Sequence, residues 1–330
     1  MSQFAMKYPA LDNVANKVEE GRDNFIVGWM IAIHLIALLA FFTFSWANLA
    51  VLVGGWFTST CLGITFGYHR LMTHRSFKAP RWIERAAGTF GVLALQGGPL
   101  EWVAHHRMHH AFTDTPNDPH NARQGFWHSH IGWLFKVVPR FDDPAIMKRY
   151  ARDIASDPYL MWLQNGYAQI GIQLALGLAL WSIGGFGMMI WGIFARLVVG
   201  YHGTWLVNSA THFFGYRRYH TDDLSRNSWW VALLTWGEGW HNNHHANQSV
   251  AKGGYTWYEF DMTWYLIWAL NKLGLAWDVN LPVVVNQIID EECGDQEGQD
   301  AVPEMESTGF GLSPIQVRVP ARSHLGYSQR

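Results

Sequence analysis

The sequence is poor in charged residues and in cysteine. Asp, Glu, Lys and Arg make up 15% of the 330 residues, and the only cysteines are Cys61 and Cys293. Two cysteines cannot build the disulfide framework of a small secreted protein, so the pattern indicates a reducing compartment. The net charge of −2 lacks the basic excess of nucleic-acid-binding proteins, and we expect no nucleic-acid partner.

Charge is missing from one long run and nearly missing from another. No Asp, Glu, Lys or Arg occurs between Asn24 and His69, and the run 158–216 contains only Arg196. A spanning helix needs about 20 apolar residues, so each run can cross a membrane twice. Helical hairpins buried in a large soluble core are disfavoured, because charge-free runs of this length are rare there. The sequence therefore predicts four transmembrane helices, at 25–46, 48–68, 163–183 and 188–210.

The expected turns inside these runs lie at Ala47-Asn48 and at Gly184–Gly187. Neither contains Lys or Arg, whereas both 1–23 and 70–155 do. Because short cytoplasmic loops carry an excess of Lys and Arg, both termini and the segment between the hairpins are expected in the cytoplasm. The first apolar run is too long for a cleavable signal peptide, and none is expected.

These features predict an all-α integral membrane protein that crosses the membrane several times. Two transmembrane hairpins carry a helical, histidine-rich cytoplasmic cap formed by 69–157 and 212–280, all within a single domain at 24–280. Residues 1–23 form a polar leader. Between Asp290 and Glu306 there are eight acidic residues and no Lys or Arg, so 281–330 is expected to be a disordered acidic tail.

Histidine is frequent, at 17 residues, and many of them lie in three clusters. The clusters are His69 with His74, HHRMHH from His105 to His110, and HNNHH from His241 to His245. Positions i, i+3 and i+4 share one face of a helix, so the last two clusters can each converge on one point. On an α-helix, His69 and His74 would lie about 140° apart. They are expected to serve different metals, or one of them to lie past the helix end.

The number of histidines limits the kind of metal site. Imidazole suits Zn, Cu, Fe and Ni, so residue type alone does not name the metal. Eight or nine imidazoles exceed the four ligands of a zinc site and indicate two neighbouring metals with open positions. An oxygen-activating iron pair needs such openings. Isolated histidines are expected to be ordinary hydrogen-bonded residues: His34, His202 and His324.

Five longer motifs contain most of these histidines. They are GYHRLMTH at 67–74, EWVAHHRMHH at 101–110, DPHNARQGFWHSHIGW at 118–133, TWLVNSATH at 204–212 and GEGWHNNHH at 237–245. With them the chain resembles the membrane fatty acyl desaturases, and specifically their delta-9 branch of acyl-CoA and acyl-lipid enzymes, from about 60 to 278. The resemblance implies a four-span fold with a cytoplasmic cap and a centre of two iron ions. This centre would use O2 and two supplied electrons to introduce a cis double bond, at the delta-9 position, into a saturated acyl chain.

Individual roles follow from the same resemblance. The implied metal ligands are His69, His74, His106, His109, His110, His212, His241, His244 and His245, with Asn208 acting through a water. The implied lining of the acyl tunnel is Gln96, Trp102, Thr204 and Trp205. Histidines outside the ligand set are His105, His120, His128 and His130. Carboxylates proposed from motif adjacency to orient histidine rings are Glu101, Asp118, Asp222 and Glu238.

The resemblance also bears on partners. Gly97, Ala104 and His105 stand where acyl-CoA enzymes carry polar and charged contacts to CoA, so the substrate is left as acyl-CoA or acyl-lipid. No haem-binding motif of a cytochrome b5-type domain and no Rossmann fingerprint occurs in the sequence. The electrons are therefore expected from a separate carrier, either ferredoxin or a cytochrome b5-like protein.

Three alternatives remain at this point. A lipid hydroxylase or alkane monooxygenase could share the scaffold. A histidine-rich metal transporter is less favoured, because transporters place ionisable ligands at mid-bilayer, whereas these clusters lie near the expected helix ends. An inactive homologue is disfavoured because every implied ligand position is filled.

Overall fold

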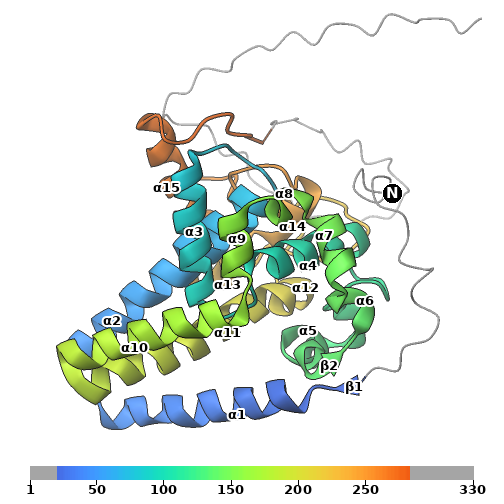
Figure 1. Cartoon of the computed structure of the whole chain (residues 1–330). Coiled ribbons are helices and arrows are strands. Elements are labelled where there is room, and N and C mark those ends of the chain that lie inside the picture. Colours follow the sequence, from blue (N-terminus) through green and yellow to red (C-terminus); the bar gives the residue numbers. More distant parts are fainter. Residues whose placement is uncertain (1–20, 283–330) are drawn as a thin grey trace, which may run out of the picture. The chain divides into compact units, whose positions relative to one another are not determined.

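The computed structural model describes residues 21–282 and is mostly helical. Figure 1 labels its elements. The N-terminal half contains β1 (Gly21–Arg22), α1 (Asn24–Ala37), η3 (Leu38–Phe42), α2 (Trp46–Trp56), η4 (Phe57–Thr73), α3 (Arg81–Leu93), α4 (Pro99–Phe112), η5 (Ala122–Gln124), α5 (Phe126–His130), η6 (Gly132–Phe135), β2 (Lys136–Val137), α6 (Pro139–Asp142), α7 (Pro144–Tyr150), α8 (Arg152–Ala155) and α9 (Pro158–Leu163). The C-terminal half contains α10 (Gly166–Met189), η7 (Ile190–Ala195), α11 (Arg196–Asn208), α12 (Ala210–Phe213), α13 (Trp229–Leu234), α14 (His241–Ala246) and α15 (Met262–Lys272). The polar leader, except for its last residues, and the acidic tail from residue 283 lie outside the described residues.

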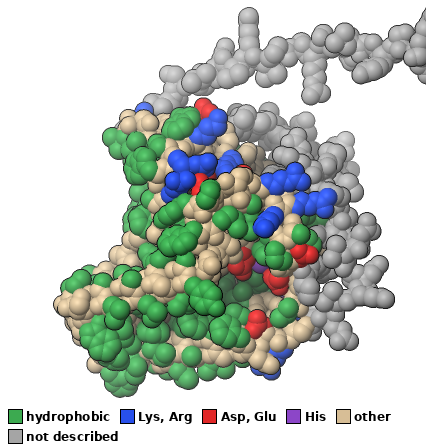
Figure 2. Space-filling model, viewed as in Figure 1, with side chains coloured by type: hydrophobic (Ala, Val, Ile, Leu, Met, Phe, Trp, Pro, Cys, Tyr) green, Lys and Arg blue, Asp and Glu red, His purple; other side chains and the backbone are tan. Residues whose placement is uncertain are grey.

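Within residues 21–282, three continuous helical runs are long and apolar enough to cross a membrane. They are Asn24–Phe42 with a mean hydropathy of 2.5, Trp46–Thr73 with 1.6 and Gly166–Phe213 with 1.7. Large apolar side chains on these runs are exposed, among them Phe41, Phe42 and Leu178. Figure 2 shows hydrophobic side chains covering the part built from α1, α2 and α10, and charged side chains gathered over the opposite part. This segregation identifies a membrane protein.

The first turn between the apolar runs lies slightly before the expected position. The helix ends at Phe42 and the next begins at Trp46, because Ser45 caps it by accepting a hydrogen bond from the Asn48 N–H at 3.1 Å. The Asn48 side chain donates back to the Thr43 carbonyl at 2.7 Å. The turn is therefore at Thr43–Ser45, and Ala47-Asn48 forms the first turn of α2.

The third run is broken at two glycines. Gly184 and Gly185 have non-helical backbone angles, and Gly185 has φ of +71°, which favours a residue without a Cβ. Beyond them the chain folds back, so that Leu180 packs on Gly192 and Gly177 faces Ile193. Figure 1 shows α10 and α11 running alongside each other. The described chain thus contains four apolar helical segments joined in two hairpins.

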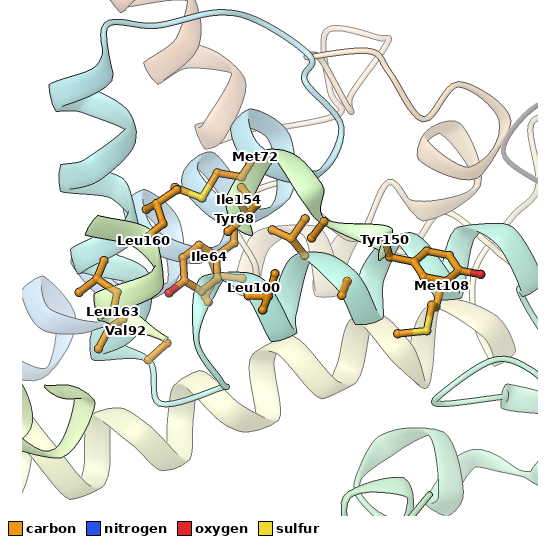
Figure 3. Close-up of a cluster of buried hydrophobic side chains, with 14 of the residues drawn as sticks. Ile64, Tyr68, Met72, Val92, Leu100, Met108, Tyr150, Ile154, Leu160 and Leu163 are labelled. Carbon is orange, nitrogen blue, oxygen red and sulfur yellow. The ribbon is translucent and has the colours of Figure 1, made fainter. Parts of the chain in front are cut away.

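The core is built around the helix that follows α2. Ile64, Tyr68 and Met72 of η4 are buried against α3, α4 and the α7–α9 region, as Figure 3 shows. Where η4 meets α3, the backbones approach so closely that only glycine fits. A Cβ at Gly63 would lie 2.4 Å from the Gly91 backbone nitrogen. Small residues allow such close helix packing inside membranes.

This close approach predicts that Gly63→Ala destabilises the protein by about 1–3 kcal/mol, the usual cost of overpacking. The change should lower the midpoint of thermal unfolding of the detergent-purified protein. Gly54→Ala is the matched control, because a Cβ there meets nothing within 4 Å. Equal midpoints for the two variants would contradict the packing described.

Candidate metal centre

Nine histidines from distant parts of the sequence gather into two groups. In each group, one nitrogen or carboxylate atom per residue lies within 4.8 Å of those of all the others. Site A contains His69, His74, His106, His110 and His244. Site B contains His109, His212, His241 and His245. These are the nine histidines that the sequence motifs singled out.

The two histidine helices distribute their side chains between the sites. On α4, His106 and His110 belong to site A, while His109 belongs to site B. On α14 the same spacing is used in reverse, and His241 and His245 belong to site B while His244 belongs to site A. Positions i and i+4 lie nearly above each other, whereas neighbouring positions differ by about 100°. The expectation that each triplet converges on one point is therefore wrong, and each helix serves both sites.

Helix geometry also explains how His69 and His74 reach the same site. The His74 N–H donates to the His69 carbonyl at 3.1 Å, an i+5 to i hydrogen bond of π type. Such a bond places residue i+5 above residue i, as an i+4 bond does in an α-helix. The two ring centroids are 4.7 Å apart. π-type turns are frequent at functional sites.

Carboxylates orient four of the rings through Nδ1. The Nδ1 of His109 lies 2.9 Å from Asp118, that of His245 lies 2.9 Å from Asp223, and that of His212 lies 3.2 Å from Asp114. The fourth contact, between His69 Nδ1 and Glu238, is 2.8 Å long but off the hydrogen-bonding direction. A carboxylate that accepts the Nδ1 proton leaves Nε2 with a free lone pair, the form that binds metals.

The Nε2 atoms then face one another at short range. In site A the distances are 3.1 Å between His69 and His244, 2.9 Å between His244 and His110, and 3.0 Å between His110 and His106. In site B they are 3.2 Å between His241 and His212 and 3.4 Å between His109 and His245. The buried Nε2 of His74 has no hydrogen-bond partner. Several lone pairs converging in a buried space fit a cation in each site.

In three rings of site A, burial favours the neutral form that a metal requires. It lowers the pKa of His106, His110 and His244 well below the ordinary value, and neighbouring histidines lower it further. Burial alone would raise the pKa of Asp118, but the adjacent His109 and His120 hold it below its usual range. These three imidazoles of site A are therefore neutral, while the outer carboxylate of Asp118 is ionised.

The family model for fatty acid desaturases matches residues 44–278. This chain belongs to the fatty acid desaturase family. It is an oxidoreductase that desaturates fatty acyl chains, and the prediction of that family and of its delta-9 branch is confirmed.

The names of similar proteins indicate the delta-9 branch of the family. The sn-1 stearoyl-lipid 9-desaturase of Synechocystis sp. is 50% identical over 265 residues, which cover 78% of this chain and 80% of that protein. The sn-2 palmitoyl-lipid 9-desaturase of Nostoc sp. is 47% identical, over 74% of this chain and 85% of its own length. The chloroplastic palmitoyl-monogalactosyldiacylglycerol delta-7 desaturase of Arabidopsis thaliana is 44% identical, over 78% and 68% respectively.

Two cavities of the desaturase meet beside site A. One extends from Trp102 and His106 towards Trp56 and Trp236, between α2, η4 and α13. The other opens towards α1 and β2 and also contains Trp102 and His106. Both are lined by Thr204 and Asn208, whereas Gln96 and Trp205 line only the second. All four residues expected in the acyl tunnel therefore line this pair of cavities.

Some outer residues of the desaturase could not be found from its sequence. Asp114 contacts His212, which is 98 positions away, and no motif links the two. The carboxylate beside His245 is Asp223 and not the neighbouring Asp222, and Glu101 lies beside Gln164 instead of a histidine. Acidic residues near each histidine cluster in the sequence are candidate partners for the rings. Their sequence positions, however, do not give the directions in which their side chains point.

The remaining histidines have other neighbours. His120 packs on the ring of His109 with centroids 4.2 Å apart, and His105 contacts the Phe141 carbonyl. His34, His202 and His130 form a hydrogen-bonded chain with distances of 3.1 and 3.0 Å. The expectation of ordinary hydrogen bonding thus fits His34 and His202, while His324 lies outside the described residues.

The contact between Asp223 and His245 predicts the effect of its removal. Asp223→Asn should weaken metal binding about 10- to 100-fold, as loss of such an outer carboxylate does. Metal content per chain, measured after equilibration with a competing chelator, checks this. Asp222→Asn is the matched control, since Asp222 is exposed. Equal metal retention by both variants would sink the assignment of Asp223.

Proposed function

We propose that the desaturase inserts a cis double bond at the delta-9 position of a saturated acyl chain held in a membrane lipid. The observation that supports this most strongly is the meeting of two all-histidine sites with one apolar cavity system. The relatives from Synechocystis sp. and Nostoc sp. described above act, by their names, on stearoyl- and palmitoyl-lipids. These names favour an acyl-lipid substrate over acyl-CoA.

The residues of sites A and B would hold two iron ions, with Asn208 acting through a water. The irons, when bound, supply with O2 an oxidant strong enough to break an unactivated C–H bond. The overall change removes two hydrogens from the acyl chain and reduces O2 to two waters, which requires two external electrons and two protons. Their source would be a one-electron carrier, ferredoxin or a cytochrome b5-like protein.

The protein itself supplies position. Trp102 stacks on His106, with ring centroids 5.0 Å apart and planes 25° from parallel, at the place where the cavities meet. An acyl chain threaded through both cavities would pass this indole and come beside site A. Apolar contact contributes about 0.8 kcal/mol per buried methylene but does not fix register. The polar pair of Gln96 and Thr204, joined by a 3.0 Å hydrogen bond, offers a fixed point for the ester end.

The same proposal gives the topology. The four apolar segments span the membrane as two hairpins, and the remaining helices form a cytoplasmic cap. His69 and His74 lie at the end of the run Trp46–Thr73, and His212 lies at the end of the run Gly166–Phe213. The sites would therefore sit at the membrane boundary. A metal transporter is disfavoured, because its ligands belong at mid-bilayer.

Product analysis tests the reaction. Cells that lack their own desaturase, expressing this chain, should form new monounsaturated fatty acids detectable by gas chromatography with mass spectrometry. His244→Ala should abolish them, because it removes a nitrogen at the centre of site A. His220→Ala, at an exposed position outside both sites, is the control and should retain them.

The products also separate the competing chemistries. Hydroxylated fatty acids in place of monoenes would assign the chain to the lipid hydroxylase reaction on the same scaffold. Retention of full monoene formation by His244→Ala would refute the assignment of site A.

A further inference from the structure

A basic patch lies on the charged part of the molecule. It consists of Lys148 and Arg149 at the end of α7 and Arg152 at the start of α8, all exposed and lining one shallow depression. Figure 2 shows Lys and Arg side chains gathered over this part. Within residues 21–282 none of the three forms an ion pair, whereas Arg75, a neighbouring arginine, pairs with two acids. Three exposed cations without acidic partners form a surface complementary to an acidic molecule.

The basic patch is fixed to α4, the helix that carries three of the nine histidines of sites A and B. Asp153, the residue after Arg152, accepts hydrogen bonds from both terminal nitrogens of Arg107 at 2.7 and 2.9 Å. Arg107 also donates a hydrogen bond to the carbonyl of Tyr150 at 2.9 Å, and Tyr150 directly follows Arg149 in the chain. Because Arg107 stands between His106 and His109 on α4, two hydrogen-bonded routes lead from the patch to both metal sites.

A second connection reaches site A from another element. Asp153 also accepts a hydrogen bond from Arg75 at 2.7 Å, and Arg75 follows His74. Asp153, which follows Arg152, therefore links the segment that carries His74 to helix α4. On this side, short covalent and hydrogen-bonded paths join the protein surface to the histidines.

The proposed reaction creates a need for such a surface. It consumes two electrons per double bond, and a one-electron carrier must therefore dock and leave twice in each turnover. Small, weak interfaces steered by charge are typical of electron-transfer encounters. Opposite charges raise the rate of association without requiring a long-lived complex.

We propose that the basic patch formed by Lys148, Arg149 and Arg152 docks the acidic face of a small one-electron carrier protein. This inference rests on the proposed function. Each docking oxidises one carrier by one electron. Two such events, with two protons and the two hydrogens of the acyl chain, reduce one O2 to two waters.

Binding of a defined carrier tests the proposal without turnover. The full-length protein in nanodiscs of uncharged lipid is titrated with a plant-type [2Fe–2S] ferredoxin at low ionic strength. Lys148→Glu/Arg152→Glu should raise the Kd on the order of tenfold or more, because like charges then face each other. The wild-type Kd should also rise with salt, since exposed charges are screened within about 10 Å at 0.1 M.

Two further variants separate docking from folding. Lys78→Glu/Lys272→Glu reverses two charges on other elements and should leave the Kd unchanged. Lys148→Gln/Arg152→Gln removes charge without placing acids at the end of α7, where they would oppose the helix dipole. It should raise the Kd by a smaller factor while keeping the thermal unfolding midpoint of the wild type.

Defined outcomes overturn the proposal. An unchanged Kd in Lys148→Glu/Arg152→Glu does so, as does an equal rise in the control pair. If Lys148→Glu/Arg152→Glu bound ferredoxin as tightly as the wild type but no longer bound anionic vesicles, the patch would instead be a lipid-binding surface. A wild-type protein that binds ferredoxin through the patch but forms no monoene would refute the proposed function alone.

Discussion

The convergence of unprotonated histidine nitrogens is the constraint on which this structure depends. Nine imidazoles gather in two sites, several pairs of their Nε2 atoms are about 3 Å apart, and carboxylates contact several of the opposite ring nitrogens. Buried lone pairs that face one another are unfavourable unless a cation lies between them. The histidine cap is therefore organised for metal, and its helices are held in place by contacts that serve this convergence.

Local backbone geometry carries much of this organisation. The π-type bond at the end of η4 moves His74 over His69, and the spacing on α4 and α14 divides each triplet between two sites. Each of these helices therefore bridges the sites and fixes the distance between them. Arg107, placed between two ligand-bearing positions of α4, ties the same helix to Asp153. Most of the histidines are consequently positioned by helices and not by a single loop.

The sequence was sufficient for features that depend on neighbours along the chain. The apolar runs, the helical character and the histidine motifs are local patterns, and they predicted a helical membrane desaturase. The pairing of His212 with Asp114 was not predictable, because it joins positions 98 residues apart. His69 and His74 do not serve different metals, because π-type hydrogen bonds replace the α-helical angles on which that expectation rested. The other expectation, that one of the two lies past the helix end, fits His74, which follows the last residue of η4. The turn at Thr43–Ser45 was displaced from Ala47-Asn48 because the Ser45 cap decides where α2 begins.

The location of the sites at the ends of apolar helices has a chemical consequence. A lipid acyl chain resides in the bilayer, whereas a carrier protein delivers electrons from water. A reaction that needs both requires a centre that each can approach from its own side. Trp102 and Thr204 line a largely apolar route on one side of α4, and the basic patch connects through Arg107 to the same helix. In the proposed arrangement α4 carries histidines of both sites, contacts the cavities through Trp102 and contacts the patch region through Arg107, so that substrate and electron donor could be present together.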